Sequence, residues 1–233
     1  MNPSDVIELL EANKNEKGIL NWEKGGRKKR QLKSYGIGLT RLRKLAKTIG
    51  RDHELSQKLW TSDIYDARII AMLIDEPKKM TKAEAEEQVE LLTEGHLEHV
   101  FSSCDASLGK TSFVQELTHE WIHHKDIVRR SCGYGLLYEL SKSKKKSVPS
   151  EAYFLERVEQ IQNTFDNEHK RVQDSMIGAL LGIGKRTVNL NTAALLFAKR
   201  IGPFEITSDG QSCEPFNLEK HLTSDYLKEK LEL

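Results

Sequence analysis

Residues 62–77, SDIYDARIIAMLIDEP, carry the strongest fold signal in the chain. Apolar residues recur there at helical spacing and leave few polar faces, which predicts a helix buried between neighbours. Ser62 or Asp63 is expected to cap this helix and Pro77 to close it. Thr81 and Glu84 follow with the spacing of a capping box, so another helix is expected to start at once. A buried helix bracketed by turn signals indicates an all-α protein.

Short helices and turns alternate along the whole sequence. No sustained period-two run of β-branched residues is present, which argues against strands. Residues 13–26 are polar and glycine-rich and are expected to form a loop, and 203–217 an irregular segment or a hairpin. The further predicted helices are Asp5–Ala12 with Ser4 as its cap, Leu39–Ile49 ended by Gly50, His53–Trp60 capped by Asp52, a segment opening at Lys82, Asp126–Ser141, Glu151–Phe165, His169–Leu181, Asn191–Ile201 and Leu218–Leu231.

Each predicted helix has an apolar face that it cannot bury alone. Helix pairs that recur at roughly 35 to 45 residues are typical of a HEAT-like solenoid, in which antiparallel pairs stack side by side. We therefore expect one all-α HEAT-like repeat domain over residues 1–233. Its expected edges are an N-terminal helix and loop at 1–26 and a C-terminal turn segment with a last helix at 203–233.

Composition limits the partners and the compartment. The 36 basic and 35 acidic residues give a net charge of +1, so a nucleic acid would have to bind a local basic surface. The three cysteines, Cys104, Cys132 and Cys213, are odd in number and widely spaced, which favours a reducing, cytoplasmic setting. No apolar run is long enough for a membrane span and no signal peptide is recognisable, so we expect no membrane association.

His119-Glu120-Trp121-Ile122-His123 matches the zinc-protease pattern H-E-x-x-H. On a helix this spacing puts two imidazoles on one face, with the glutamate able to activate a metal-bound water. The alternative is that Trp121 and Ile122 pack inward while the polar side chains face water. Downstream third ligands do not fit an extended zincin signature, so we favour the second interpretation and expect no metal or cofactor. The candidates for that ligand are Asp126, Glu139 and His169.

Two glycine-lysine motifs resemble phosphate-binding loops. Gly109-Lys110-Thr111 lacks the first glycine, which would fall at Cys104, and no strand precedes it. Lys110 is therefore expected to be a surface or backbone-contacting cation. Gly184-Lys185-Arg186 could grip a phosphate or could be an ordinary helix end.

Phe101, Asp105 and the Arg129-Arg130 pair form the most interesting constellation. If residues 101–105 are helical, the Phe101 ring and the Asp105 carboxylate lie on one face and could serve a cationic ligand. A guanidinium at the start of the following long helix could bond a phosphate. An ion pair between Asp105 and Arg130 that joins adjacent helix pairs is the structural alternative.

Several ordered blocks resemble the AlkD-like DNA alkylation repair proteins over roughly residues 30 to 205. They are SYGIGLTRLRKLAKTIG, HELSQKLWTSDIYDARIIAMLI, the F-x-x-x-D segment, the tryptophan of HEWIHH, and IVRRSCGYGLLYEL. The resemblance implies a HEAT-like solenoid and N-glycosylase action on N3- and N7-alkylated purines. It matches Asp105 to the family's catalytic aspartate and Arg130 to its arginine, while Phe101 and Gly178 stand where the family has tryptophans.

The resemblance implies a mechanism and a partner. Asp105 would stabilise an oxocarbenium-like sugar and position water, Phe101 would shield the cationic base, and Arg130 would anchor a phosphate of double-stranded DNA that is alkylated or distorted. A non-catalytic binder of distorted or branched DNA and a protein-interaction scaffold remain alternatives, and a zinc hydrolase is a remote one. We expect a monomer. Basic groups that could contact DNA lie at 27–30, 41–47, 142–146 and 185–186. The expected DNA-binding residues are Arg27, Lys28, Arg30, Arg41, Lys110, Arg129, Lys185 and Arg186.

Overall fold

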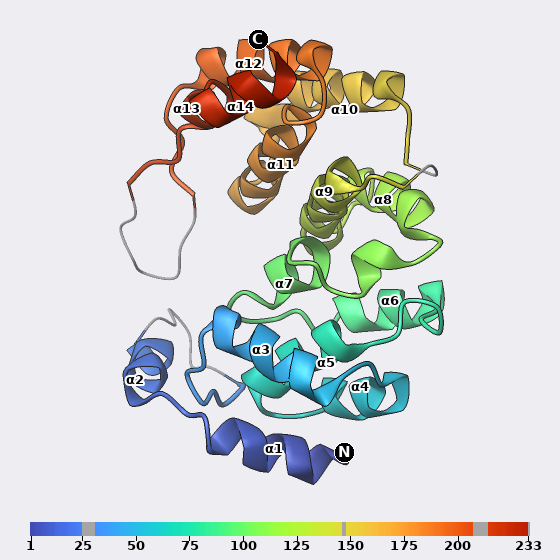
Figure 1. Ribbon diagram of the computed structural model, residues 1–233, viewed down its shortest axis with the longest axis vertical. Helices are drawn as coiled ribbons and strands as arrows, with labels where there is room; N and C mark the ends of the chain where they lie inside the picture. The colour runs from blue at the N-terminus through green and yellow to red at the C-terminus, as the bar shows by residue number, and fades with distance from the viewer. Residues whose placement is uncertain (25–30, 146–147, 207–213, 233) are drawn as a thin grey trace. The chain divides into compact units, whose positions relative to one another are not determined.

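A computed structural model describes residues 1–24, 31–145, 148–206 and 214–232 of the chain. In that part of the chain, fourteen α-helices and two short 3-10 turns make up the regular structure (Figure 1). Contacts group them into two compact units, Met1–Phe113 and Val114–Leu233. The single domain expected from the sequence stays a prediction. No helix in the described ranges has the length and apolar character needed to cross a membrane.

The first unit is built around one buried helix, α5 (Tyr65–Ile74), which has eight of its ten residues buried. Its expected burial is confirmed. Lys33 forms a parallel bridge with Ile64 at the start of α5. The backbone NH of His96, just before α7, donates to the Tyr65 hydroxyl at 3.0 Å. The other elements of this unit are α1 (Pro3–Glu11), α2 (Glu16–Lys24), α3 (Leu39–Ile49), α4 (His53–Trp60), α6 (Lys82–Val89), α7 (Leu97–Ser103) and η1 (Leu108–Lys110).

The second unit shows the repeat most directly. Its elements are α8 (Val114–Ile122), α9 (Ile127–Lys142), α10 (Glu151–Thr164), η2 (Phe165–Asn167), α11 (Lys170–Ile183), α12 (Val188–Ile201), α13 (Leu218–Leu222) and α14 (Asp225–Leu231). Ser131 bonds Ser175 and Arg186 bonds the Ser141 carbonyl, so α9 and α11 run side by side in the same direction.

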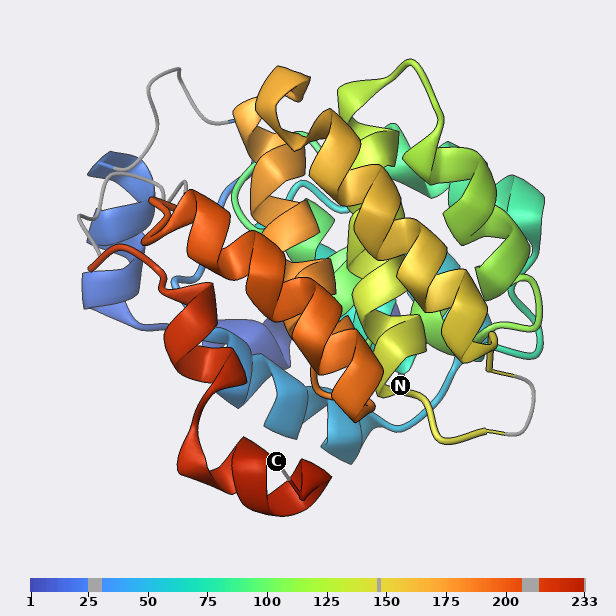
Figure 2. The ribbon, with the colours of Figure 1, turned by 90° about the horizontal axis from the view of Figure 1, so that it is seen from above.

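Helices α10 and α12 of the second unit also lie side by side and parallel (Figure 2). Asn189 donates to Glu151 at their starts, and Arg200 donates to the Gln162 carbonyl at their ends. The cross-helix bonds of both parallel pairs join residues 38 to 45 positions apart. Equivalent helices therefore recur at the spacing that the sequence predicts for HEAT-like repeats.

Local helix signals are mostly confirmed. Asp52 caps α4, the Thr81–Glu84 capping box opens α6, and Gly50 ends α3 with a φ of 85°. The expected caps at Ser62 or Asp63 and at Ser4 are wrong. Ile64 precedes α5 without a side-chain cap because pairing with residue 33 fixes its backbone, and Asn2 caps α1.

Two predicted segments need correction. Helix α2 lies inside the expected loop at 13–26, because Trp22 packs against Tyr65 with ring centroids 4.3 Å apart and donates to the Leu32 carbonyl. The predicted last helix is two helices, α13 and α14, separated at Thr223 and Ser224. Phe204 and Phe216 form an antiparallel bridge, as expected of a hairpin base. Cys213 lies outside the described residues.

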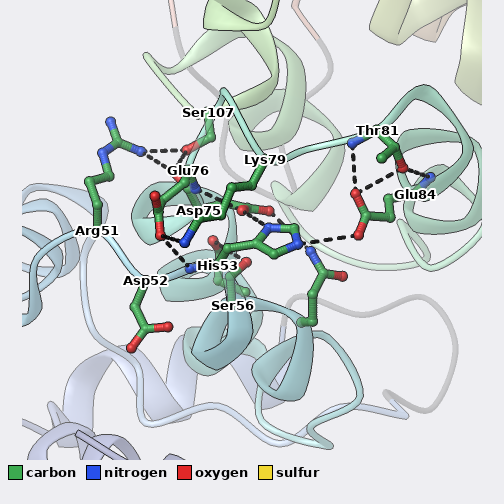
Figure 3. Close-up of polar contacts among 12 residues, drawn as sticks. Arg51, Asp52, His53, Ser56, Asp75, Glu76, Lys79, Thr81, Glu84 and Ser107 are labelled. Carbon is green, nitrogen blue, oxygen red and sulfur yellow. Dashed lines mark hydrogen bonds and ion pairs between the residues drawn. The ribbon is translucent and has the colours of Figure 1, made fainter.

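A partly buried chain of polar contacts fastens α4, the end of α5 and α6 together (Figure 3). The Asp75 carboxylate, 1% exposed, contacts His53 Nδ1 at 2.7 Å, and His53 Nε2 lies 3.4 Å from Glu84. Burial raises the pKa of Asp75, and the hydrogen bond from His53 opposes that rise. Nearby Ser56 donates to the Ala71 carbonyl instead of facing the imidazole. These contacts join three helices and do not form a nucleophile and base pair.

Candidate functional site

The candidate site of the first unit is the turn from Cys104 to Ser107. Helix α7 ends at Ser103, and Asp105 has a φ of 58°, in the left-handed region. The premise that residues 101–105 are one helix is therefore wrong, and Phe101 and Asp105 do not share a helix face. A left-handed aspartate costs about 1 kcal/mol, and such strain concentrates at functional sites. The Asp105 side chain is exposed.

Basic side chains hold the backbone of this turn on both sides. Arg43 Nη2 donates to the Cys104 carbonyl at 2.9 Å, and Lys110 Nζ donates to the Asp105 carbonyl. Arg51 donates to the Ser107 hydroxyl, and the Ser107 NH donates to the Met72 carbonyl at 3.1 Å. The expected backbone contact of Lys110 is confirmed. The exposed carboxylate thus stands on a turn that α3, α5 and η1 fix in place.

Phe101 does not line this turn as a stacking surface. Its ring is 1% exposed and meets Trp60 edge to face, with ring centroids 5.5 Å apart. The expected shielding of a cationic base by Phe101 stays a prediction, and the position of the ring in the core of the first unit does not support it.

Arg130, near the start of α9 in the second unit, contacts the loop after α8 and the segment before α11. Its Nη2 lies 3.0 Å from Glu168 Oε2, and its Nη1 donates to the His124 and Lys125 carbonyls after α8. Both charged side chains are mostly buried, at 19% and 17% exposed. Burial, followed by the charge of Glu168, raises the pKa of the neighbouring Tyr134 to about 12. The carboxylate partner of Arg130 is therefore Glu168, from its own unit.

The other expected DNA-binding residues fall into three groups. Arg27, Lys28 and Arg30 lie outside the described residues. Arg41 donates two hydrogen bonds to the Asn13 side chain. The Arg129 side chain is 14% exposed and forms an ion pair with Asp126. Both arginines therefore have structural contacts.

Arg186 and Lys185 are partly buried basic residues after α11. Arg186 donates to the Ser141 and Ser143 carbonyls and lies over the Phe154 ring at 4.7 Å, so it caps the end of α9. Burial lowers the pKa of both side chains, and the nearby Lys230 lowers that of Lys185 further. The motif at 184–186 is therefore a helix end with structural contacts, the second of the two interpretations of the sequence.

The HEWIH segment, residues 119–123, packs as the second interpretation of the sequence predicted. Trp121 and Ile122 are buried, while His119, Glu120 and His123 are exposed. His123 lies just beyond α8, with Nδ1 2.8 Å from the His119 carbonyl and Nε2 3.2 Å from Gln160. No cluster of three or more metal-ligating side chains occurs among the residues that the structure describes.

Comparisons with known proteins place the chain in a family. The family model described as DNA alkylation repair enzyme matches residues 6–200. The chain belongs to the DNA alkylation repair enzyme family. A search of curated proteins found no match.

A solved structure shares the fold of this DNA alkylation repair family member. That protein is described as one of a new family related to the HEAT-like repeat DNA glycosylases, with affinity for branched DNA structures. The TM-score is 0.82 at 21% identity, over 99% of this chain and 96% of the other. At this identity the match establishes the HEAT-like repeat fold, and the resemblance seen in the sequence is confirmed.

Gly178 of this family member lies midway along α11, half-exposed, with no atom within 4 Å of the place where a Cβ would stand. An aromatic side chain would therefore fit there without a clash at its base. At this position, where the resemblance places a tryptophan of the family, the structure has open space.

The sequence did not reveal several important residues. Arg43 and Arg51 brace the Asp105 turn, and Glu168 holds Arg130. Asp66, fully buried, accepts bonds from Ser34 Oγ and from the NH groups of residues 35 and 37. An acidic residue inside the apolar run 64–74 is the one signal that could have indicated the role of Asp66.

Proposed function

We propose that this protein binds DNA through its phosphate backbone and prefers distorted or branched DNA over a regular duplex. The observation that carries the proposal is the HEAT-like fold, shared over 99% of the chain with a protein described as having affinity for branched DNA. Membership of the DNA alkylation repair family over residues 6–200 supports the same partner. Because the net charge is only +1, binding uses local basic surfaces and weakens steeply with salt.

The test is a direct comparison of DNA forms. Fluorescence anisotropy is measured with a four-way junction and with a linear duplex of the same length, at low salt near ~50 mM. The proposal expects binding to both, with the junction bound more tightly. Absence of binding to either DNA contradicts it and favours the protein-interaction scaffold. Equal affinity contradicts only the preference for branched DNA.

A second candidate function is hydrolysis of the glycosidic bond of cationic N3- or N7-alkylpurines. The observation that favours it is the exposed Asp105 carboxylate in a strained left-handed turn. A cationic base is a good leaving group, so one carboxylate could stabilise the oxocarbenium-like sugar and orient the attacking water. The buried Phe101, the open position at Gly178 and the engagement of Arg130 by Glu168 give this function less support than DNA binding.

Asp105→Asn is a sharp test of the hydrolytic function. Asparagine also tolerates the left-handed conformation, so the substitution removes the charge while leaving the turn in place. Release of 7-methylguanine from alkylated duplex DNA should occur with the wild type and fall sharply in Asp105→Asn. Release no faster than the spontaneous rate with the wild type contradicts this function without affecting the DNA-binding proposal.

The proposed setting is a cytoplasmic monomer. A monomer with one DNA-binding surface should form complexes of one protein per junction, which sedimentation of the free and bound protein measures.

A further inference from the structure

One side of helix α3 is an exposed basic stripe formed by Lys44 and Lys47. The helix, LTRLRKLAKTI, buries Leu42, Leu45 and Ala46 and contains no acidic residue. Both lysines are exposed. At 100° per residue the two lysines lie about 60° apart on the helix surface, flanked by Arg41, one turn before Lys44, and by Arg43, one turn before Lys47. Arg41 binds Asn13.

The lysines of this stripe differ from several surface lysines of the chain that are paired with a carboxylate. Neither Lys44 nor Lys47 forms an ion pair with a described residue. Several other lysines are neutralised by a carboxylate three or four positions away: Lys79 by Glu76, Lys142 by Glu139, Lys170 by Asp174 and Lys228 by Asp225. The positive charge on α3 is thus not compensated within the helix.

The stripe is linked directly to the turn that carries Asp105. Arg43, one turn before Lys47 on α3, donates to the Cys104 carbonyl at 2.9 Å. Arg51, two residues beyond the end of α3, donates to the Ser107 hydroxyl at the other end of that turn. The basic helix and the exposed carboxylate therefore belong to one braced part of the first unit.

Exposed lysines are common in the last turn of a helix, because a positive charge there interacts favourably with the helix dipole. Lys47 is such a lysine. That effect explains one lysine in the last turn. It does not explain Lys44 in the middle of the helix, or the hydrogen bond from Arg43 of the same helix to the strained turn that carries Asp105.

We propose that Lys44 and Lys47 bind neighbouring phosphates of one DNA strand and hold that strand beside the Asp105 turn. This inference rests on the proposed DNA binding and assigns it a surface. Residues three apart on a helix have Cβ atoms about 5–6 Å apart, and flexible lysine stems let both ammonium groups reach adjacent phosphates of one backbone. Arg43 positions the turn against this surface and does not itself need to touch DNA.

The experiment compares two double variants in anisotropy titrations across a range of salt concentrations. Lys44→Gln/Lys47→Gln removes two phosphate contacts, so the slope of log K against log salt should become shallower by about 1.8 for duplex DNA. The matched control is Lys58→Gln/Lys78→Gln, which neutralises two exposed lysines of the same unit that lie outside α3 and should keep the wild-type slope. Circular dichroism melts establish that each variant is folded.

The outcomes separate the surface from the function. If the wild-type protein binds DNA and the Lys44→Gln/Lys47→Gln variant has the same salt slope as the control, the proposed role of the two lysines is contradicted. The DNA-binding proposal is then unaffected. A wild-type protein that binds no DNA overturns both. Loss of affinity in the α3 variant alone, with a shallower salt slope, is the expected result.

Discussion

Arg130 and Glu168 form a mostly buried ion pair, with 3.0 Å between Nη2 and Oε2, that ties the start of α9 to the residues preceding α11. The same guanidinium caps two carbonyls that follow α8. A side chain with these internal contacts fastens the start of α9 to the segments that follow α8 and precede α11, which is a structural role.

Arg130→Ala should therefore reduce the stability of the folded protein by about 1–3 kcal/mol, because it leaves carbonyl groups and a mostly buried carboxylate without their donor. Urea denaturation measures the change. Asp225→Asn is the control, since Asp225 is fully exposed and its pair with Lys228 should contribute nothing measurable. An Arg130→Ala variant with wild-type stability and greatly weakened DNA binding would instead support the phosphate-anchoring role.

Two glycines of α11 should respond in opposite directions to alanine. Gly178→Ala should stabilise the protein by about 0.5–1 kcal/mol, because its Cβ enters open space and glycine is costly within a helix. Gly182→Ala should destabilise it, since its Cβ would stand 2.1 Å from Ser141 Oγ and 2.7 Å from the Tyr138 ring. Thermal melts of both variants measure the difference, and a shift of the same sign for both contradicts the packing of α9 against α11.

The Asp66 carboxylate should make stability depend on pH in a definite direction. Burial raises its pKa above the ordinary value of 3.8, although bonds from Ser34 and from backbone NH groups oppose the rise. Between pH 3.8 and the raised pKa, the folded state therefore holds a proton on Asp66 that the unfolded state has released. The contribution of this group is therefore complete below pH 3.8 and is lost as pH rises through the raised pKa.

Asp66→Asn isolates this effect. As pH increases across that interval, the wild type should lose stability relative to the variant. The altered hydrogen bonds of the variant add a loss of stability that does not depend on pH. Urea titrations at a series of pH values give the difference. A difference that moves toward the wild type over the same interval would show that the hydrogen bonds outweigh burial.

The HEWIH segment should be insensitive to metal. His123 already contacts the His119 carbonyl and Gln160, and the histidines face water. Dialysis against a chelator should leave the melting temperature and DNA affinity unchanged, as should Glu120→Gln. A chelator-dependent drop in either property that zinc restores would contradict this interpretation.

The parts of the fold that could be predicted depend on local interactions. Asp52 caps α4 through a bond three residues away, and Thr81 with Glu84 opens α6 within one turn. The apolar spacing of 64–74 also fixes the burial of α5, because helical periodicity is itself local.

The parts that could not be predicted depend on distant partners. Helix α2 is held by the packing of Trp22 on Tyr65, and Arg130 is held by a carboxylate 38 positions away. The same limit applies to the site. Phe101 and Asp105 have the spacing of a helical pair, but Arg43 and Lys110 fix a turn between them that no short motif encodes.

The salt dependence of binding to a four-way junction tests the proposed DNA contact most directly. Anisotropy titrations of the wild-type protein should give a straight line of log K against log salt with a negative slope, of magnitude about 0.9 for each phosphate contacted in a duplex arm. Because Lys44 and Lys47 are proposed to bind two phosphates, the magnitude should be at least about 1.8. Binding that is absent at low salt, or that does not change with salt, would contradict a protein that holds DNA by its phosphates.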